Sequence, residues 1–148
     1  MAQVKSTVGR LNPFDVVAGI LVYSSLKGRD TTGHPTDEWR VEFPDVYSAL
    51  FHLRRRYPEL LSGFVFRERG IGPYCQRLEG ILASLGAAHI VSVDNPAFKF
   101  LRLECDQKDH LQRELEAHSN QQNLHWIKTI AREFDRFVLA KAKKNPKA

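Results

Sequence analysis

The stretch GIGPYCQRLEGILASLGAAHIVSV, residues 70–93, decides the fold that the sequence predicts. It begins with turn formers, because Gly72 permits a turn and Pro73 suits the first position of a helix. Apolar side chains then recur at spacings of three and four residues, the pattern of one buried helix face: Tyr74, Leu78, Ile81, Leu82 and Leu85. Gly86 is placed to end the helix. The stretch therefore predicts a helix that begins at Pro73 and leads, after Gly86, directly into a strand.

Two β-prone runs follow the predicted helix and are separated by the turn formers DNP. Residues of high strand propensity on both sides of such a turn are typical of a hairpin. We therefore expect Ala88–Val93 and Ala97–Leu103 to pair as antiparallel strands.

The N-terminal half predicts a helix, a short strand and a second helix. Asn12 can cap the first helix, and Gly28 is suited to end it. WRVEF, residues 39–43, alternates between apolar and charged side chains, which predicts a half-buried strand. Pro44 then opens the second helix, whose arginine triplet, residues 54–56, lies near its negative C-terminal end. FVFRERG, residues 64–70, fits either a short strand or a tight connector.

The C-terminal segment, residues 106–143, has apolar side chains at helical spacing along most of its length. The run SNQQN, residues 119–123, is its weakest helix former, so one long helix and two helices with a break at this run are both open. The apolar stripe is longer than one small core needs, which predicts dimerisation or packing across the first helix. We divide the chain into a winged-helix-like domain (1–104), a C-terminal helical arm (105–143) and a basic tail expected to be disordered (144–148).

The composition is that of an ordered globular protein. Of 148 residues, 43% are hydrophobic and 26% are charged, both close to average. The longest apolar run, Val16–Tyr23, is too short to span a bilayer, and the N-terminus lacks the apolar region of a signal peptide. We therefore expect a cytoplasmic protein without a membrane partner. Cys75 and Cys105 have no metal-type neighbours and fit a reducing compartment as inert thiols.

Positive charge gathers in two segments of the chain, whose formal net charge is +5. Between residues 54 and 77, six arginines stand against two glutamates. A second basic cluster lies near the C-terminus: Arg136, Lys141, Lys143, Lys144 and Lys147. Such clusters are typical of surfaces that bind nucleic acid or an acidic partner. A solvated face and a frayed basic tail are the alternative interpretation of each cluster.

The predicted order of elements is helix, short strand, helix, helix, hairpin, helix. Over Asp15–Leu103 this order resembles the winged helix-turn-helix superfamily, in which the third helix enters the DNA major groove and the hairpin forms the wing. The local resemblance is in residues 72–93, with a Gly-Pro start, spaced leucines, a glycine stop and β-prone residues. It implies an α+β fold: a winged-helix-like helical domain with a small antiparallel β-hairpin wing and a long C-terminal helix or helix pair.

The resemblance also implies which side chains would contact DNA. Gln76 and Arg77 lie in the first turns of the third helix, opposite its leucines, and are of the types that pair with adenine and guanine edges. Four further basic residues would contact phosphates: Arg67, Arg69, Lys99 and Arg102. Glu79 on the same helix face and Asp94 at the wing tip count against DNA and favour a protein partner.

No catalytic motif occurs in the sequence, so we predict no enzyme activity, no cofactor and no metal site. A phosphate-binding loop and a nucleophile elbow are both absent. His118 and His125 would lie about 10 Å apart along a helix, too far to bind one zinc ion. A thiol at a helix N-terminus, as predicted for Cys75, can be reactive, but one cysteine without a base is not a catalytic dyad.

Two functions follow from these observations. The leading hypothesis is a non-enzymatic transcriptional regulator that binds duplex DNA through its third helix and hairpin, as a homodimer joined by its C-terminal helix. The alternative is a winged-helix-like adaptor or antitoxin-type module that binds another protein and not DNA. The order of elements also resembles small prophage-associated and antitoxin-like proteins, which is why a protein partner is included.

Overall fold

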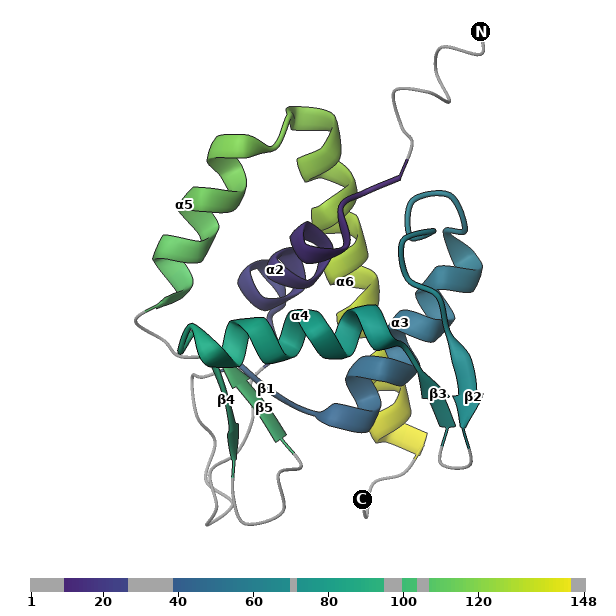
Figure 1. Ribbon diagram of the computed structural model, residues 1–148. Coiled ribbons are helices and arrows are strands. Elements are labelled where there is room, and N and C mark those ends of the chain that lie inside the picture. Colours follow the sequence, from purple (N-terminus) through teal and green to yellow (C-terminus); the bar gives the residue numbers. More distant parts are fainter. Residues whose placement is uncertain (1–9, 27–38, 70–71, 95–99, 104–106, 145–148) are drawn as a thin grey trace, which may run out of the picture.

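The computed structural model describes residues 10–26, 39–69, 72–94, 100–103 and 107–144 (Figure 1). The described elements are α2 (Pro13–Tyr23), β1 (Arg40–Glu42), α3 (Phe43–Arg56), β2 (Arg67–Arg69), β3 (Gly72–Tyr74), α4 (Gln76–Ala87), β4 (Val91–Asp94), β5 (Phe100–Leu103), α5 (Lys108–His118) and α6 (Gln121–Lys144). The chain therefore has an α+β fold, as the sequence predicts.

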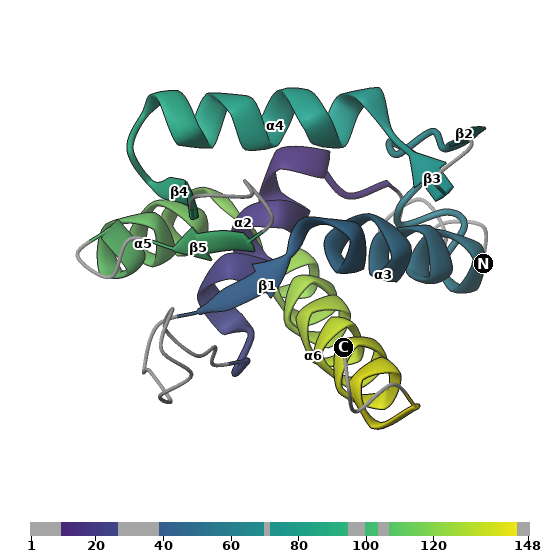
Figure 2. The ribbon, with the colours of Figure 1, turned by 90° about the horizontal axis from the view of Figure 1, so that it is seen from below.

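Three short strands from distant parts of the chain form one antiparallel sheet in the order β1–β5–β4. In the central strand, Leu101 lies opposite Val41 of β1 and Val93 of β4. The predicted hairpin after α4 is confirmed as the pair β4–β5. A second hairpin, β2–β3, lies at the other end of α4 from this sheet (Figure 2).

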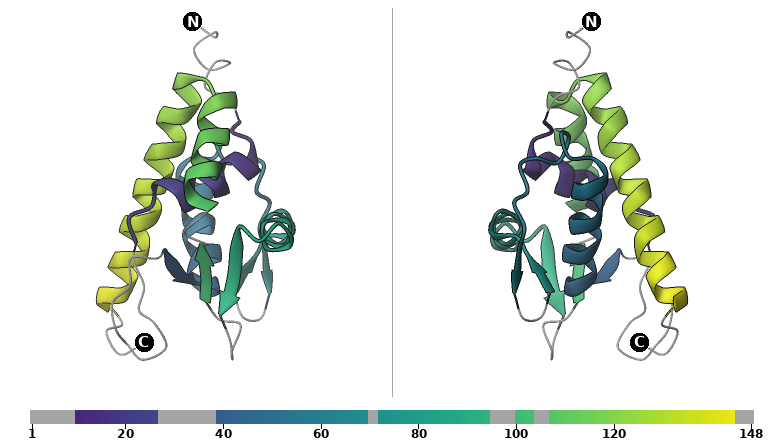
Figure 3. Two further views of the ribbon diagram at one scale, coloured as in Figure 1. Left: turned by 90° about the vertical axis from the view of Figure 1, so that its left-hand side faces the viewer. Right: turned by 90° about the vertical axis from the view of Figure 1, so that its right-hand side faces the viewer.

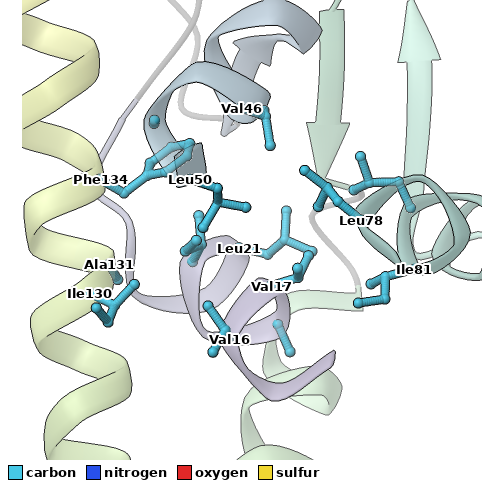
Figure 4. Close-up of a cluster of buried hydrophobic side chains, with 14 of the residues drawn as sticks. Val16, Val17, Leu21, Val46, Leu50, Leu78, Ile81, Ile130, Ala131 and Phe134 are labelled. Carbon is cyan, nitrogen blue, oxygen red and sulfur yellow. The ribbon is translucent and has the colours of Figure 1, made fainter. Parts of the chain in front are cut away.

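Helix α2 forms the centre of the hydrophobic core. Every residue from Val16 to Val22 is buried, because α4, α5 and α6 all pack against this helix. Figure 4 shows Phe134 of α6 on one side of α2 and Leu78 and Ile81 of α4 on the other. Helix α2 is therefore buried on most of its sides from Val16 to Val22.

Helix α6 packs against α2 and α3 of its own chain (Figure 3). Gly19 allows a close approach of α2, because a Cβ atom at this position would overlap the side chain of Ile127. Two ion pairs of 2.7 Å, Arg56–Glu133 and Lys141–Asp45, join α6 to α3. Of the two predicted uses of the C-terminal stripe, the structure shows packing across the first helix.

The C-terminal segment consists of two helices, with the break at the predicted run. Helix α5 ends at His118 and α6 begins at Gln121. Asn120 stabilises the start of α6, because its side-chain oxygen accepts a hydrogen bond of 2.7 Å from the Asn123 N–H.

The start of α2 is as predicted, but its end is not. The Asn12 side chain accepts hydrogen bonds from the N–H groups of Phe14 and Asp15, at 2.9 and 3.3 Å. The helix ends at Tyr23, well before Gly28, which lies outside the described residues. The chain leaves the helix early because Asp135 of α6 binds the next two residues, Ser24 and Ser25.

The predicted start of the third helix is wrong. Gly72–Tyr74 forms strand β3, and α4 begins at Gln76 after Cys75. A Gly-Pro pair suits a helix start and a turn equally well, and here antiparallel pairing with β2 decides between them. Tyr74 therefore does not belong to the apolar stripe of α4. For FVFRERG, pairing with β3 likewise favours the short strand, because Arg67–Arg69 forms β2.

The predicted glycine stop of the third helix is wrong as well. Gly86 lies inside the last turn of α4, and the residue with a left-handed backbone is His89, with φ of 61°. The N–H groups of His89 and Ile90 donate to the carbonyls of Gly86 and Leu85, at 3.0 and 2.9 Å, which is a Schellman motif. This motif occupies residues 88–90, so β4 begins at Val91 instead of the predicted Ala88. Residues 97–99 of the predicted second strand lie outside the described residues.

Candidate functional site

Helix α4 lies on the outside of the molecule with one face buried (Figures 1 and 2). The predicted apolar residues Leu78, Ile81, Leu82 and Leu85 are all buried. The exposed residues of the helix form the opposite face: Gln76, Arg77, Glu79, Gly80, Ala83, Ser84 and Ala87. The charged side chains of this exposed face, Arg77 and Glu79, both lie in its first turn, and its later turns carry none.

A groove of about 340 Å³ lies between the β2–β3 hairpin and the start of α4. It is lined by Gly63, Val65, Arg67, Tyr74, Gln76 and Arg77, and we call it the arginine groove. Three of the six predicted DNA contacts, Arg67, Gln76 and Arg77, therefore come together at one place. The side chains of Arg67 and Arg77 are exposed, and the unpaired N–H groups at the start of α4 add partial positive charge. The groove is suited to an anionic group such as a phosphate.

Glu79 does not extend freely from the exposed face of α4. Its carboxylate accepts a hydrogen bond of 2.5 Å from the hydroxyl of Tyr74, which also lines the arginine groove. The Tyr74 ring stacks on Tyr47 of α3, with ring centres 6.2 Å apart and planes 10° apart. Burial, together with the nearby charge of Glu79, raises the pKa of Tyr47 to about 12, so this hydroxyl stays protonated at neutral pH.

Of the other three predicted contacts, Arg102 lies away from the arginine groove. Arg69 is in β2, opposite Gly72. Arg102 is in β5, opposite Arg40 and Ser92, in the sheet at the other end of α4. Lys99 lies outside the described residues.

The arginine triplet at the end of α3 has contacts of its own within the chain. Arg54 donates to the carbonyl of Phe64 at 3.0 Å, and Arg56 pairs with Glu133 at 2.7 Å. The guanidinium carbon of Arg55 lies 5.9 Å from the centre of the Phe51 ring. The basic cluster seen in the sequence therefore separates into a structural part on α3 and the arginine groove.

Sequence reasoning missed the walls of the arginine groove, Gly63, Val65 and Tyr74. A signal for them was present, because GPY follows RERG and a glycine turn between two extended triplets is typical of a hairpin. Assigning GPY to the helix hid this pattern. Without the hairpin, the proximity of Arg67 to the start of α4 could not be inferred.

Of the cysteines and histidines considered as thiol or metal candidates in the sequence, the structure describes Cys75, His118 and His125. Cys75 is fully buried, with 0% of its surface exposed, which denies a substrate access to the thiol. Cys105 lies outside the described residues. His118 pairs with Asp15 at 3.0 Å, and His125 packs edge-on against Trp126. No group of three or more potential metal ligands occurs within the described ranges.

Among the described helices, none combines the length and hydrophobicity that a membrane crossing requires.

Comparison with known proteins finds no family model, no curated protein and no solved structure that matches this chain.

Proposed function

We propose that this chain is a winged-helix protein that binds duplex DNA, with α4 as the recognition helix and the β4–β5 hairpin as the wing. The sheet order supports the proposal, because β1, between the first two helices, pairs with the hairpin that follows the third. The exposed face of α4 also supports it, since Gly80, Ala83 and Ser84 would allow bases to approach the helix closely. The proposed role is that of a non-enzymatic regulator in the cytoplasm.

The arginine groove is the observation that carries this proposal. Arg67 and Arg77 come from different elements yet line one hollow at the positive end of α4. A DNA phosphate in this groove would accept hydrogen bonds from both guanidinium groups. Gln76, in the same turn, would then contact a base edge, with adenine as its preferred partner.

One feature departs from a simple helix-turn-helix. Residues 57–75 connect α3 to α4 and include the β2–β3 hairpin, whereas the turn of that motif has only about 3–4 residues. In the proposed complex this longer connection has a use, because it carries Arg67 to the start of α4. Arg69, Lys99 and Arg102 remain proposed phosphate contacts at the two hairpins.

A fluorescence-anisotropy titration of a labelled mixed-sequence duplex tests the proposal. We expect binding at low salt that weakens by orders of magnitude between about 50 and 200 mM salt. Arg77→Ala should weaken binding about fivefold, because each phosphate contact contributes roughly 1 kcal/mol. Arg113→Ala, an exposed arginine on α5, is the matched control and should bind like the wild type. Absence of binding at low salt, or equal losses in both variants, would overturn the proposal.

The adaptor is the second candidate. The outward face of α4 beyond its first turn has small, uncharged residues, and Glu79 in the first turn is acidic. A protein partner fits such a face as well as DNA does. Pull-down with a Gln76→Ala/Arg77→Ala double variant separates the two candidates. Retention of a partner protein, with no DNA bound by the wild type, would favour the adaptor.

We also propose a homodimer formed through the C-terminal helix. Although the buried stripe of α6 is used within its own chain, Leu139 remains 52% exposed and offers an apolar contact outside this core. Light scattering after gel filtration should give twice the mass of the chain, and Leu139→Glu should give the monomer. A monomeric wild type would contradict the dimer and leave DNA binding to be tested separately.

A further inference from the structure

A second depression runs along α3, separate from the exposed face of α4. It consists of two adjoining hollows, one of about 290 Å³ between the start of α3 and β3, the other of about 640 Å³ between the later turns of α3 and Phe137 of α6. Ser48 and Pro73 line both hollows, so the two form one continuous depression, which we call the α3 groove.

The α3 groove has the length of a short extended peptide. Its lining residues on α3 include Pro44, Ser48, Phe51 and Arg55, which follow one another at helical spacing and share one face. At 1.5 Å per residue, Pro44 and Arg55 are about 16 Å apart along the helix axis. About five residues in polyproline II conformation, at 3.1 Å each, span this distance.

The walls of the α3 groove are mainly aromatic and are held in place by ring contacts. Tyr47 stacks on Tyr74. Phe51 packs edge-on against Phe66, with ring centres 5.5 Å apart. The ring centres of Phe137 and His52 are 5.1 Å apart. Grooves lined by fixed aromatic rings accept proline-rich segments, which are already extended and lose little entropy on binding.

One end of the α3 groove is positively charged. Arg55 is exposed there and contacts the ring of Phe51. Arg56 lies beside it and shares the single carboxylate of Glu133 with Arg136, each at 2.7 Å, so positive charge is in excess. Within the described part of the chain, no aspartate or glutamate lines either hollow. The charge of the groove is complementary to an acidic partner.

We propose that the α3 groove binds an acidic, proline-containing segment of another protein in an extended conformation. Both hollows are open along one side, whereas small-molecule sites enclose most of their ligand. Stacked bases would need free ring faces, but Tyr74 covers one face of Tyr47 and the guanidinium of Arg55 approaches the ring of Phe51. An acidic peptide therefore fits better than a small molecule or a single-stranded nucleic acid.

Selection from a phage-displayed library of random linear peptides tests this proposal on the full chain. We expect enriched peptides to contain proline beside aspartate or glutamate. A synthetic peptide of the enriched sequence, labelled for anisotropy, then serves as the probe. Ser48→Leu, which places a larger side chain where the two hollows join, should weaken its binding at least about tenfold. Arg55→Glu should weaken it about fivefold, the effect of roughly 1 kcal/mol from one exposed charge.

Two matched variants on α5 serve as controls. Ala117→Leu adds an aliphatic side chain and Arg113→Glu reverses a charge, both at exposed positions away from the groove, and both should bind the probe like the wild type. Unchanged thermal melting of Ser48→Leu confirms that it folds, and Arg55→Glu tests the groove without filling it. Failure to enrich any peptide, a consensus without acids or proline, preferential capture of single-stranded DNA, or binding unaffected by both groove variants would overturn the proposal. Duplex DNA titrations of the same variants report on α4 separately.

Discussion

Asp135 is a nearly buried carboxylate, 8% exposed, that fixes the path of the chain after α2. It accepts hydrogen bonds from the Ser24 hydroxyl at 2.5 Å, from the Ser25 N–H at 2.8 Å and from the Ser25 hydroxyl at 3.0 Å. Such bonds to a charged group are stronger than those between neutral groups. One residue of α6 thus determines where the first helix stops, although it lies more than a hundred residues away in sequence.

Asp135→Ala should lower the free energy of unfolding by about 3 kcal/mol, because it leaves the donors of Ser24 and Ser25 without their acceptor. Urea denaturation measures the loss. Asp109→Ala, an exposed acid in the first turn of α5, is the control and should cost less than about 1 kcal/mol. Equal losses in the two variants would contradict the role given to Asp135.

The ion pair of His118 with Asp15 predicts a pH dependence. The hydrogen bond to Asp15 raises the pKa of His118 above its ordinary value of 6.5. Since the folded-state pKa is raised, the stabilisation is full below the unfolded-state pKa and is lost as pH rises through the folded-state pKa. The contribution of this ion pair to the free energy of unfolding is small, because the His118 side chain is 54% exposed and solvent screens its charge. NMR titration of the ring should show the raised pKa, and Asp15→Asn should lower it; an unchanged titration would contradict the pairing.

The end of α4 depends on His89, whose left-handed backbone conformation is seldom adopted by residues other than glycine. A left-handed backbone costs a residue with a side chain roughly 1–2 kcal/mol, and glycine avoids this cost. His89 has this conformation at φ 61°, while Gly86 is in ordinary helix. The Schellman hydrogen bonds hold the strained residue in place, and they set the start of β4 two residues beyond it.

His89→Gly should therefore raise the free energy of unfolding, by about 1 kcal/mol. Thermal or urea denaturation measures the change. Ala88→Gly, one residue earlier at φ −85° and ψ 2°, gains nothing from glycine and should be neutral or destabilising. A loss of stability in His89→Gly would contradict the assigned helix end.

Sequence reasoning worked for elements where local pattern and tertiary contacts agree. The spacing of Leu78, Ile81, Leu82 and Leu85 predicted the buried face of α4, and Asn12 predicted the start of α2. It failed where a partner distant in sequence decides. Pro73 could begin a helix or lie in a strand, and the pairing with β2 settles that choice. Because the sequence pattern assigns Tyr74 to a helix, it did not predict that Tyr74 lines the arginine groove together with Arg67 and Arg77.

The core of the molecule depends on the close contact of α2 with α6. Gly19 and Gly80 are both inside helices, but a Cβ atom at Gly19 would overlap Ile127 and one at Gly80 meets nothing within 4 Å. Helix propensity alone would favour alanine at both positions by roughly 0.5–1 kcal/mol. The contact with Ile127 therefore makes alanine unfavourable at Gly19, whereas alanine remains favourable at Gly80.

Gly19→Ala should lower the free energy of unfolding by about 1–3 kcal/mol, the usual cost of overpacking. Gly80→Ala should raise it by about 0.5–1 kcal/mol. Urea denaturation of both variants under the same conditions measures the difference in sign. Stabilisation by both substitutions would mean that α2 and α6 do not approach as closely as described.

The proposed function also belongs to the whole molecule, because it needs α4, the β2–β3 hairpin and the long connection between α3 and α4 at once. Arg67 and Arg77 are ten residues apart in sequence, and only the fold makes them neighbours. The sequence predicted a basic surface, but it did not show that the arginines have different surroundings. Arg54 and Arg56 bind groups within the chain, whereas Arg67 and Arg77 line the arginine groove. The proposed DNA contacts are therefore a small set of residues whose contribution to binding can be measured.

The most direct test is the salt dependence of duplex binding by the wild type and by the double variant Arg67→Ala/Arg77→Ala. If both arginines bind phosphates, the slope of log K against log salt should become shallower by about two in the double variant. Arg113→Ala should leave the slope unchanged. Equal slopes in the wild type and the double variant, or no binding of duplex DNA at low salt, would contradict the proposed function.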